Sequence, residues 1–369
     1  MHIPDGYLSP STCAVLYGAS APCGWVALRR VKKLFHTRRV PLLSLFAAFS
    51  FVVMMFNIPI PGGTTAHAVG AGIAAIVLGP SASIISISAA LFIQALFFGD
   101  GGITTFGANC FNMAIVGSVV AWLVYRAFAR RVEITSPRRV MAAALAGYIG
   151  INASALCAAI ELGLQPRFFK DAAGAPLYAP YPLHIAVPAI MIAHLTFAGL
   201  AELVITGGVV AYLQRADPSL LRFTAPGAAS GPGVAERVAG QRAPGALRPL
   251  WLAIALLMVL TPLGILGTGA AWGEWSARAF SDPVAREKIA AVSQNAAPPA
   301  QAPQGLKHLA SIWSAPFPNY APAFFRRPAF NYMLSAVFGA GVIVLLFFCI
   351  GWLVEKRRAK DPEPVAEET

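Results

Sequence analysis

The sequence predicts an all-α polytopic membrane protein with about nine transmembrane helices, in a seven-helix block followed by a two-helix block. Of its 369 residues, 57% are hydrophobic and only 12% are charged, which is about half the charge of a typical soluble domain. The mean hydropathy is +0.64, and the hydrophobic residues fall in long uninterrupted runs. Because a run of roughly 18 or more apolar residues is typical of a bilayer span, these observations indicate a chain embedded in a lipid bilayer.

The apolar runs define the expected spans. In chain order they are 8–28, 41–57, 66–79, 82–99, 107–125, 140–162, 184–213, 250–268 and 330–354. The third run is short for a bilayer, which needs roughly 20 residues. It joins the fourth run at Gly79-Pro80, and the two either cross separately or form a re-entrant hairpin. Both alternatives leave the sidedness of the later spans unchanged.

The spans divide the chain into four regions. Residues 1–213 form the seven-helix block, and residues 250–354 form the two-helix block, which contains a long outer loop at about 269–329. Residues 214–249 are rich in Gly, Pro and other small residues, a composition typical of a flexible linker. Residues 355–369 form a C-terminal tail.

Basic residues predict the orientation. Twenty of the 28 Lys and Arg residues lie on one side of the nine-span arrangement, in 29–39, 126–139, 214–249 and 355–360. The short loops on the other side, 58–65 and 100–106, contain none. By the positive-inside rule the N-terminus is therefore outside, and the linker and C-terminus are cytoplasmic. The net charge of +12 reflects this topology. No nucleic-acid partner is expected, because the charge is dispersed among membrane-flanking loops.

The first two residues offer three nitrogens to a metal ion. They are the Met1 α-amine, the His2 backbone amide and the His2 imidazole. Amine and amide close a five-membered chelate ring, and the amide with the nearer imidazole nitrogen, Nδ1, closes a six-membered ring. Square-planar nitrogen sites of this kind suit Ni²⁺ or Cu²⁺. Residues 1–7 lack the basic segment of a signal peptide, and the bulky second residue disfavours removal of the initiator methionine, so the amine is expected to remain on Met1.

The loop between the second and third spans supplies the expected fourth nitrogen. It contains two prolines and two glycines and ends at His67, which lies on the same side of the membrane as Met1. Imidazole is a preferred ligand for this class of metal. Polar residues near the same face could orient a ligating imidazole, although the two aspartates are equally typical of turns. These candidates are Asp5, Asp100, Asn109 and Asn112.

Several ionisable residues lie within the expected spans besides His67. Glu161 and Glu202 are near span ends and are expected to extend their carboxylates to the interface. His194 and the preceding His184 could suggest a haem-binding electron carrier. Ten residues apart on one helix, they point roughly 80° apart and lie about 15 Å apart along the axis, so one haem would not take both. The chain has neither a His-Glu-x-x-His motif nor a Walker motif, which disfavours a membrane enzyme and predicts that ATP hydrolysis occurs elsewhere.

The motifs of the first block are similar to those of the CbiM/NikM family. They are MHIPDG at 1–6, Gly-Gly-Thr-x-x-His at 62–67, Gly-Asp-Gly-Gly at 99–102, Gly-Ala-Asn at 107–109 and Asn-Met-Ala at 112–114. The resemblance implies a substrate-specific component of an energy-coupling-factor transporter in a bacterial or archaeal cell membrane. It implies that Met1, His2 and His67 bind the metal. It also implies two kinds of partner: a transmembrane coupling (T) subunit and two ATPase subunits. Thr65-Ala66 precede His67 where the family more often has Ser-Gly.

The second block resembles the small CbiN/NikN accessory subunit. It has Gly273-Glu274-Trp275 just outside its first span and Pro-Gln-Gly-Leu at 303–306. The family's usual Pro-Asp-Gly-Leu has an aspartate where this chain has Gln304, so any role of that aspartate does not transfer. The fused arrangement and the square-planar argument favour Ni²⁺ as the transported substrate over the alternative, Co²⁺ for cobalamin synthesis.

Overall fold

The computed structural model describes residues 1–32, 40–222, 224, 248–267, 269–321 and 327–360. Most of the predicted linker (225–247) and the end of the predicted tail (361–369) lie outside these residues. The elements in chain order are α1 Pro10–Lys32, α2 Val40–Met54, β1 Ile58–Ile60, β2 Thr64–Ala66, α3 Ala71–Leu78, α4 Pro80–Ile93, η1 Gln94–Phe98, α5 Phe106–Asn109, η2 Cys110–Val116, α6 Gly117–Ala129, α7 Pro137–Phe168, α8 Leu183–Ala193, η3 His194–Ala198, α9 Gly199–Ala216, α10 Ser219–Arg222, α12 Arg248–Leu260, η4 Thr261–Leu266, η5 Ala277–Phe280, α13 Pro283–Ala291, α14 Gln304–Leu309, η6 Pro318–Tyr320 and α15 Pro328–Lys360.

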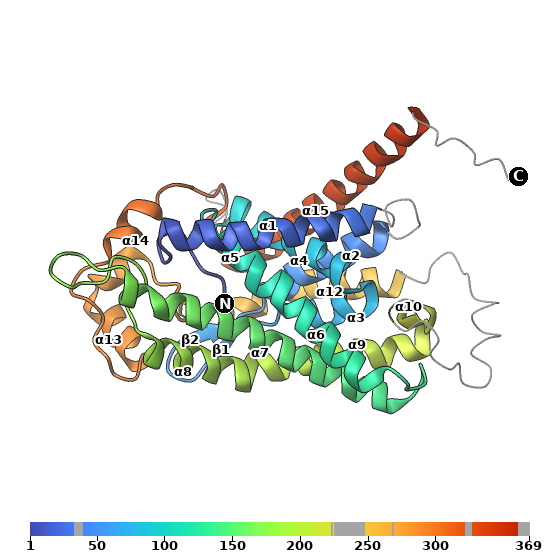
Figure 1. Ribbon diagram of the computed structural model, residues 1–369, viewed down its shortest axis with the longest axis horizontal. Coiled ribbons are helices and arrows are strands. Elements are labelled where there is room, and N and C mark those ends of the chain that lie inside the picture. The colour runs from blue at the N-terminus through green and yellow to red at the C-terminus, as the bar shows by residue number, and fades with distance from the viewer. Residues whose placement is uncertain (33–39, 223, 225–247, 268, 322–326, 361–369) are drawn as a thin grey trace, which may run out of the picture.

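The predicted all-α membrane architecture is confirmed. Within the described residues, six helical stretches are long and apolar enough to cross a bilayer: Pro80–Phe98, Phe106–Ala129, Pro137–Phe168, Leu183–Ala216, Arg248–Leu266 and Pro328–Lys356. They coincide with the fourth to ninth expected spans. The first and second expected spans are also helical, as the 23-residue α1 and the 15-residue α2. Helices α1, α7 and α9 run along the long axis of the molecule, and α15 extends obliquely from the bundle (Figure 1).

The third expected span is only partly helical. Residues 67–70 are not helical, and α3 has eight residues, which makes it about 12 Å long. Glycines in the left-handed region bound it, with φ of +76° at Gly70 and +84° at Gly79, a conformation that other residues adopt only at a cost. Almost all of α3 is buried by neighbouring helices. The sequence from His67 to Gly70 therefore lies inside the bundle as irregular backbone, which a membrane protein tolerates only where protein or water surrounds it.

The two-helix block packs directly on the first block. Helix α15 lies against α2, and α12 contacts both. An aromatic cluster joins them: Phe51 of α2 and Phe98 of η1 meet Tyr320 of the outer segment, with ring centroids 6.3 and 4.7 Å from the tyrosine ring. The outer segment, with α13 and α14, lies at the same end of the bundle as the β1–β2 hairpin (Figure 1). In that hairpin Ile58 is paired with Ala66 and Ile60 with Thr64.

Candidate metal site

The N-terminus lies inside the protein. Met1 is 6% exposed, His2 3% and Ile3 0%, whereas the first residues of most domains are poorly ordered unless something holds them. The side chain of Asn109 and the loop after η1 hold them here. Ile3 N donates to Asn109 Oδ1 at 2.8 Å, and Ile3 O accepts from Gly102 N at 3.0 Å and Asn109 Nδ2 at 3.1 Å. Asn109 thus fixes the backbone next to the predicted chelating dipeptide.

Asp5 fixes the turn that leads away from the dipeptide. Its carboxylate accepts from Ile103 N at 3.1 Å, from Thr104 N at 2.7 Å and from the Thr104 hydroxyl. A Cβ at Gly102 would collide with Asp5, so glycine permits this close approach. Asp5 therefore acts on the site through the backbone and does not touch an imidazole ring.

We expect Asp5→Ala to lower metal affinity by about tenfold, because groups that orient metal ligands typically contribute 10- to 100-fold. Titration calorimetry with Ni²⁺ on the full-length chain measures this. Asp171→Ala is the matched control, since Asp171 also accepts two loop N–H groups, at 2.9 and 2.8 Å, but in a different loop. Equal losses in both variants would show that the effect is not specific to the N-terminal turn.

The structure brings the two predicted imidazoles together. The rings of His2 and His67 are stacked, with centroids 4.9 Å apart and an interplanar angle of 25°. His67 is 3% exposed, and its Nδ1 lies 3.0 Å from Ala68 O. Nδ1 therefore carries the hydrogen, and Nε2 carries the lone pair that a metal needs. The Nε2 atoms of both rings are buried and have no hydrogen-bond partner.

Asp100 contacts His2 directly. Its Oδ1 lies 2.9 Å from His2 Nδ1, and its Oδ2 accepts from the Tyr320 hydroxyl at 2.6 Å. Burial by itself raises the pKa of the Asp100 carboxyl, but the His2 ring, the His67 ring and the Tyr320 hydroxyl together outweigh burial, and the pKa is below its ordinary value. Because His2 Nδ1 faces Asp100 here, the predicted six-membered chelate requires the His2 ring to turn about its Cβ–Cγ bond.

The Met1 amine forms an ion pair with a residue of the second block. Its nitrogen lies 3.1 Å from Glu274 Oε1. The sequence analysis used Glu274 only as part of the Gly-Glu-Trp motif and did not place it at the site. Its position just outside a span, on the same side as Met1, was the available indication. The Tyr7 hydroxyl donates to Trp275 O at 2.6 Å, so the motif holds both ends of the N-terminal segment.

The Pro-Gln-Gly-Leu segment covers the N-terminal turn. Gly6 has φ +89°, and a Cβ there would lie 2.7 Å from Leu306 Cα and 2.8 Å from Gly305 O. Gly305 N in turn donates to Leu177 O at 2.7 Å. Gln304 is exposed at the start of α14. The glycine and leucine of this segment, rather than its second residue, therefore make the contact.

Gly6→Ala is expected to lower the melting temperature of the purified protein, through about 1 kcal/mol of backbone strain and a further ~1–3 kcal/mol from overpacking. Gly174→Ala is the matched control, because Gly174 has φ +81° and nothing within 4 Å of an added Cβ. Thermal unfolding of both variants separates the destabilisation caused by backbone strain from that caused by overpacking. An equal shift for Gly174→Ala would contradict a tight contact at Gly6.

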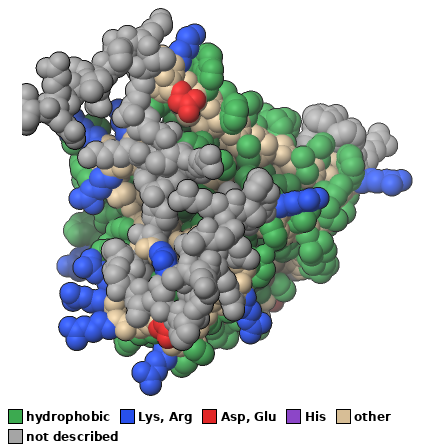
Figure 2. Space-filling model, turned by 90° about the vertical axis from the view of Figure 1, so that its right-hand side faces the viewer, with side chains coloured by type: hydrophobic (Ala, Val, Ile, Leu, Met, Phe, Trp, Pro, Cys, Tyr) green, Lys and Arg blue, Asp and Glu red, His purple; other side chains and the backbone are tan. Residues whose placement is uncertain are grey.

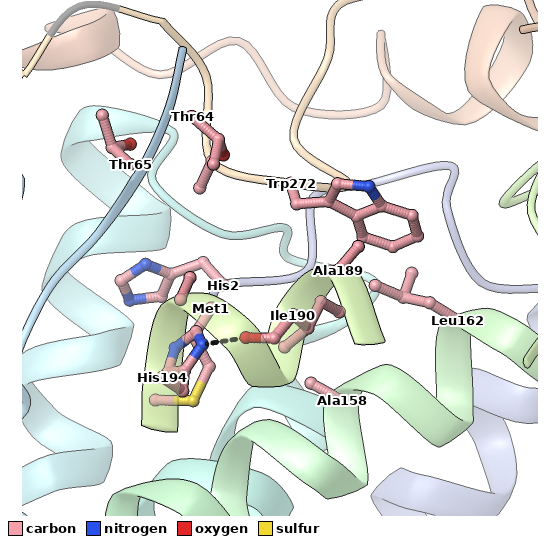
Figure 3. Close-up of a pocket in the computed structure, with 12 residues that line it drawn as sticks. Met1, His2, Thr64, Thr65, Ala158, Leu162, Ala189, Ile190, His194 and Trp272 are labelled. Atoms are coloured by element: carbon pink, nitrogen blue, oxygen red, sulfur yellow. Dashed lines mark hydrogen bonds between the residues drawn. The ribbon is translucent and has the colours of Figure 1, made fainter. Parts of the chain in front are cut away.

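A small cavity beside the site contains a third imidazole. Met1, His2, Trp272 and His194 are among the residues that line it (Figure 3). His194 is 4% exposed. Its Nδ1 lies 2.8 Å from Ile190 O, so Nε2 carries the lone pair, and Nε2 has no partner. The sequence pattern predicted for His194 only a polar position within a span and the disfavoured role of a haem ligand. His184 is exposed at the start of α8, apart from this cavity.

The remaining polar candidates lie away from the imidazoles. Asn112, on η2, donates to Glu161 Oε2 at 2.8 Å rather than to a histidine. Glu202 is 1% exposed, so the expectation that it reaches the interface was wrong. Its carboxylate accepts from Val69 N and Gly70 N at 2.9 Å each. Glu202 thus caps the N-terminus of α3, where a negative charge is favoured, and fixes the backbone that follows His67.

Within the described ranges of the chain, no cluster of three or more His, Cys, Asp and Glu side chains is arranged to hold a metal ion. The site predicted from the sequence adds two main-chain nitrogens to the imidazoles. They are the Met1 amine and the His2 amide, which are buried next to the stacked imidazoles because they belong to His2 and the residue before it.

Comparisons with known proteins give a family match for each of the two blocks. Residues 2–220 match the family model CbiM, described as cobalt uptake substrate-specific transmembrane region, and residues 248–356 match the PDGLE domain. A fused nickel transport protein NikMN of Rhodobacter capsulatus is 54% identical over 93% of this chain and 95% of that protein. A probable fused nickel transport protein LarMN of Lactiplantibacillus plantarum is 40% identical over 94% of this chain and 96% of that protein.

A solved structure extends the similarity to three dimensions. A truncated transition metal transporter is 55% identical, with a TM-score of 0.54, and covers 58% of this chain and 98% of that chain. The match of the family model covers more than half of the 369 residues. The chain therefore belongs to the CbiM family of substrate-specific transmembrane proteins, in a form that carries a C-terminal PDGLE domain.

Proposed function

We propose that this chain is the substrate-binding membrane subunit of an ATP-driven uptake transporter whose cargo is Ni²⁺, with Co²⁺ as the alternative cargo. The observation that carries the proposal is the meeting of a buried chain terminus with two stacked imidazoles whose Nε2 atoms have no partner. Buried polar atoms normally have hydrogen-bond partners. A cation that takes nitrogen ligands would satisfy Nε2 of His67 directly, and it would take Nδ1 of His2 once that ring has turned. The names of the fused relatives support nickel over cobalt.

The ion is held by four nitrogens: the Met1 amine, the His2 amide, His2 Nδ1 and His67 Nε2. Two adjacent chelate rings from one dipeptide impose a planar arrangement, which favours Ni²⁺ over metals that prefer a tetrahedral site. Binding displaces the proton of the amide and of the ammonium group. Glu274, which pairs with the ammonium at 3.1 Å, loses that partner when the amine turns its lone pair to the metal.

The route to the site runs between the two blocks. A cavity of about 430 Å³ is lined by residues of both, including His2, His67, Asp100 and Glu274. Carboxylates that line a low-dielectric cavity attract divalent cations, and Asp100 and Glu274 are two such residues here. Carboxylate oxygen is a poorer ligand for nickel than imidazole nitrogen, so the ion moves on to the four nitrogens. We propose on this basis that the two-helix block (250–354) contributes to capture by the seven-helix block (1–213).

Energy for release comes from partner subunits. The chain has no Walker motif, and the family resemblance implies a transmembrane coupling (T) subunit and two ATPase subunits. In this arrangement the N-terminus faces outward and the C-terminus is in the cytoplasm, as the positive-inside rule predicts. The ion is then captured at the outer face of the cell membrane and released inward.

Metal content and competition on the purified full-length chain with an untagged N-terminus test the proposal. We expect one Ni²⁺ to bind per chain and protons to be released on binding. We also expect that Zn²⁺ at the same concentration as Ni²⁺ does not displace the bound nickel. A higher affinity for Co²⁺ than for Ni²⁺ would assign cobalt as the cargo. Binding of Zn²⁺ in preference to both would contradict a planar nitrogen site.

A further inference from the structure

A second cavity lies at the opposite end of the bundle from the metal site. Its volume is about 500 Å³, and it is enclosed by the junction of α3 and α4, the last turns of α6 and the start of α7. Arg126, Arg130 and Arg139 line it, together with Trp122, Tyr125 and apolar or neutral residues. None of the described residues that line it is acidic. Figure 2 views the molecule from this end and shows Lys and Arg side chains around the outline of this face.

The guanidinium of Arg139 is buried, and its partners among the described residues are all neutral. Arg139 is 0% exposed. It donates to Tyr125 Oη at 2.8 Å, to Ala129 O at 3.1 Å and to the backbone oxygen of Glu133 at 3.2 Å, and also to Val132 O. These partners are all uncharged. Buried charges are normally paired, so Arg139 indicates an anion nearby.

The other groups around the cavity add positive potential. Arg126 lies in the last turn of α6 and Arg130 directly follows that helix, and the Arg126 guanidinium lies 5.1 Å from the centroid of the Trp122 ring. The N-terminus of α4 opens on the same cavity at Gly79 and Pro80, and no side chain caps it. The uncapped start of a helix favours an anion. Three guanidinium groups and this helix end therefore surround one space.

We propose that this cavity binds the phosphate group of an anionic membrane phospholipid. Arginine pairs with phosphate through two parallel hydrogen bonds, and basic pockets at the ends of transmembrane helices bind anionic headgroups. The cavity lies where the apolar span Phe106–Ala129 ends, with Trp122 at the level that tryptophan prefers at a membrane boundary. Apolar side chains on the adjoining turns, Leu123 at 52% and Met141 at 71% exposed, face the surroundings where acyl chains would lie.

The test compares lipid binding by the full-length chain and by the double variant Arg126→Gln/Arg130→Gln. Native mass spectrometry in detergent is carried out with phosphatidylglycerol, with phosphatidylcholine and with inorganic phosphate. We expect phosphatidylglycerol to bind and the double variant to bind it about thirtyfold more weakly, since each basic residue near the lipid surface contributes roughly fivefold. Arg139 is kept, because its loss would also remove the hydrogen bonds that join α6 to α7.

Arg167→Gln is the matched control. Arg167 is an exposed basic residue in the last turn of α7, the end of that helix remote from Arg139, and its replacement should leave phosphatidylglycerol binding unchanged. Equal binding of phosphatidylcholine and phosphatidylglycerol would overturn the proposal, as would undiminished lipid binding by the double variant. Binding of inorganic phosphate as tight as that of the lipid would assign the site to a soluble anion and overturn the lipid assignment.

Discussion

Two residues added ahead of Met1 are expected to lower the nickel affinity by at least about a hundredfold, equivalent to ~2.7 kcal/mol. The extension converts the amine into a peptide amide and so removes one of the four proposed ligands. It also removes the ion pair with Glu274. In addition, Met1 is 6% exposed, so added residues cannot be accommodated without displacing the segment from its place between the blocks. Titration calorimetry with Ni²⁺ on the purified full-length chain measures the loss.

The same two residues added after Thr369 provide the control, because they change length and composition equally at the other end of the chain. The thermal stability of both extended variants without metal shows whether each is folded. A folded, N-terminally extended protein that binds Ni²⁺ as tightly as the original would exclude the amine as a ligand.

His67→Ala is expected to reduce nickel affinity by a similar factor. The substitution leaves the Met1-His2 chelate with three nitrogens and removes the ring that stacks on His2 with a centroid separation of 4.9 Å. Because Nε2 of His67 has no protein partner, no internal hydrogen bond of that atom is lost. The effect should therefore appear in metal affinity more than in stability. Competition against a chromophoric chelator measures the affinity of the variant.

His308→Ala is the matched histidine control. His308 is exposed in the last turn of α14, in the same outer region as the site, and makes no contact with His2 or His67 in the described structure. Its replacement should leave nickel affinity unchanged within twofold. If His308→Ala weakened binding as much as His67→Ala, or if both variants bound normally, the assignment of His67 as a ligand would be untenable.

Sequence reasoning predicted the local features well and the long-range ones poorly. The apolar runs predicted the membrane helices, and the positions of Met1, His2 and His67 on one side of the membrane predicted that they meet. The pairing of Met1 with Glu274 joins residues 273 positions apart, and no local pattern encodes such a contact. The second block was predicted to be an accessory unit, and the position of Glu274 just outside a span, on the same side as Met1, was the one indication that its motifs enclose the chain terminus.

The partly helical run 66–79 and the burial of Glu202 both differ from expectation, and both have their physical origin in the short helix α3. Gly70, with φ +76°, starts this helix inside the bundle, so its uncapped N–H groups need an acceptor in the protein. Glu202 meets that need and is buried as a result. The sequence showed an apolar run from 66 to 79 and a carboxylate near the end of another span. It did not show that the helix starts halfway along the run, and so the expected exposure of Glu202 was wrong.

X-ray absorption spectroscopy at the nickel edge tests the four-nitrogen site most directly. On the full-length chain with a free Met1 amine, the account predicts a first shell of four nitrogen donors in a planar arrangement, with neither sulfur nor a carboxylate oxygen. Loss of one nitrogen in the His67→Ala variant should follow. A six-coordinate shell rich in oxygen, unchanged by that substitution, would contradict the account.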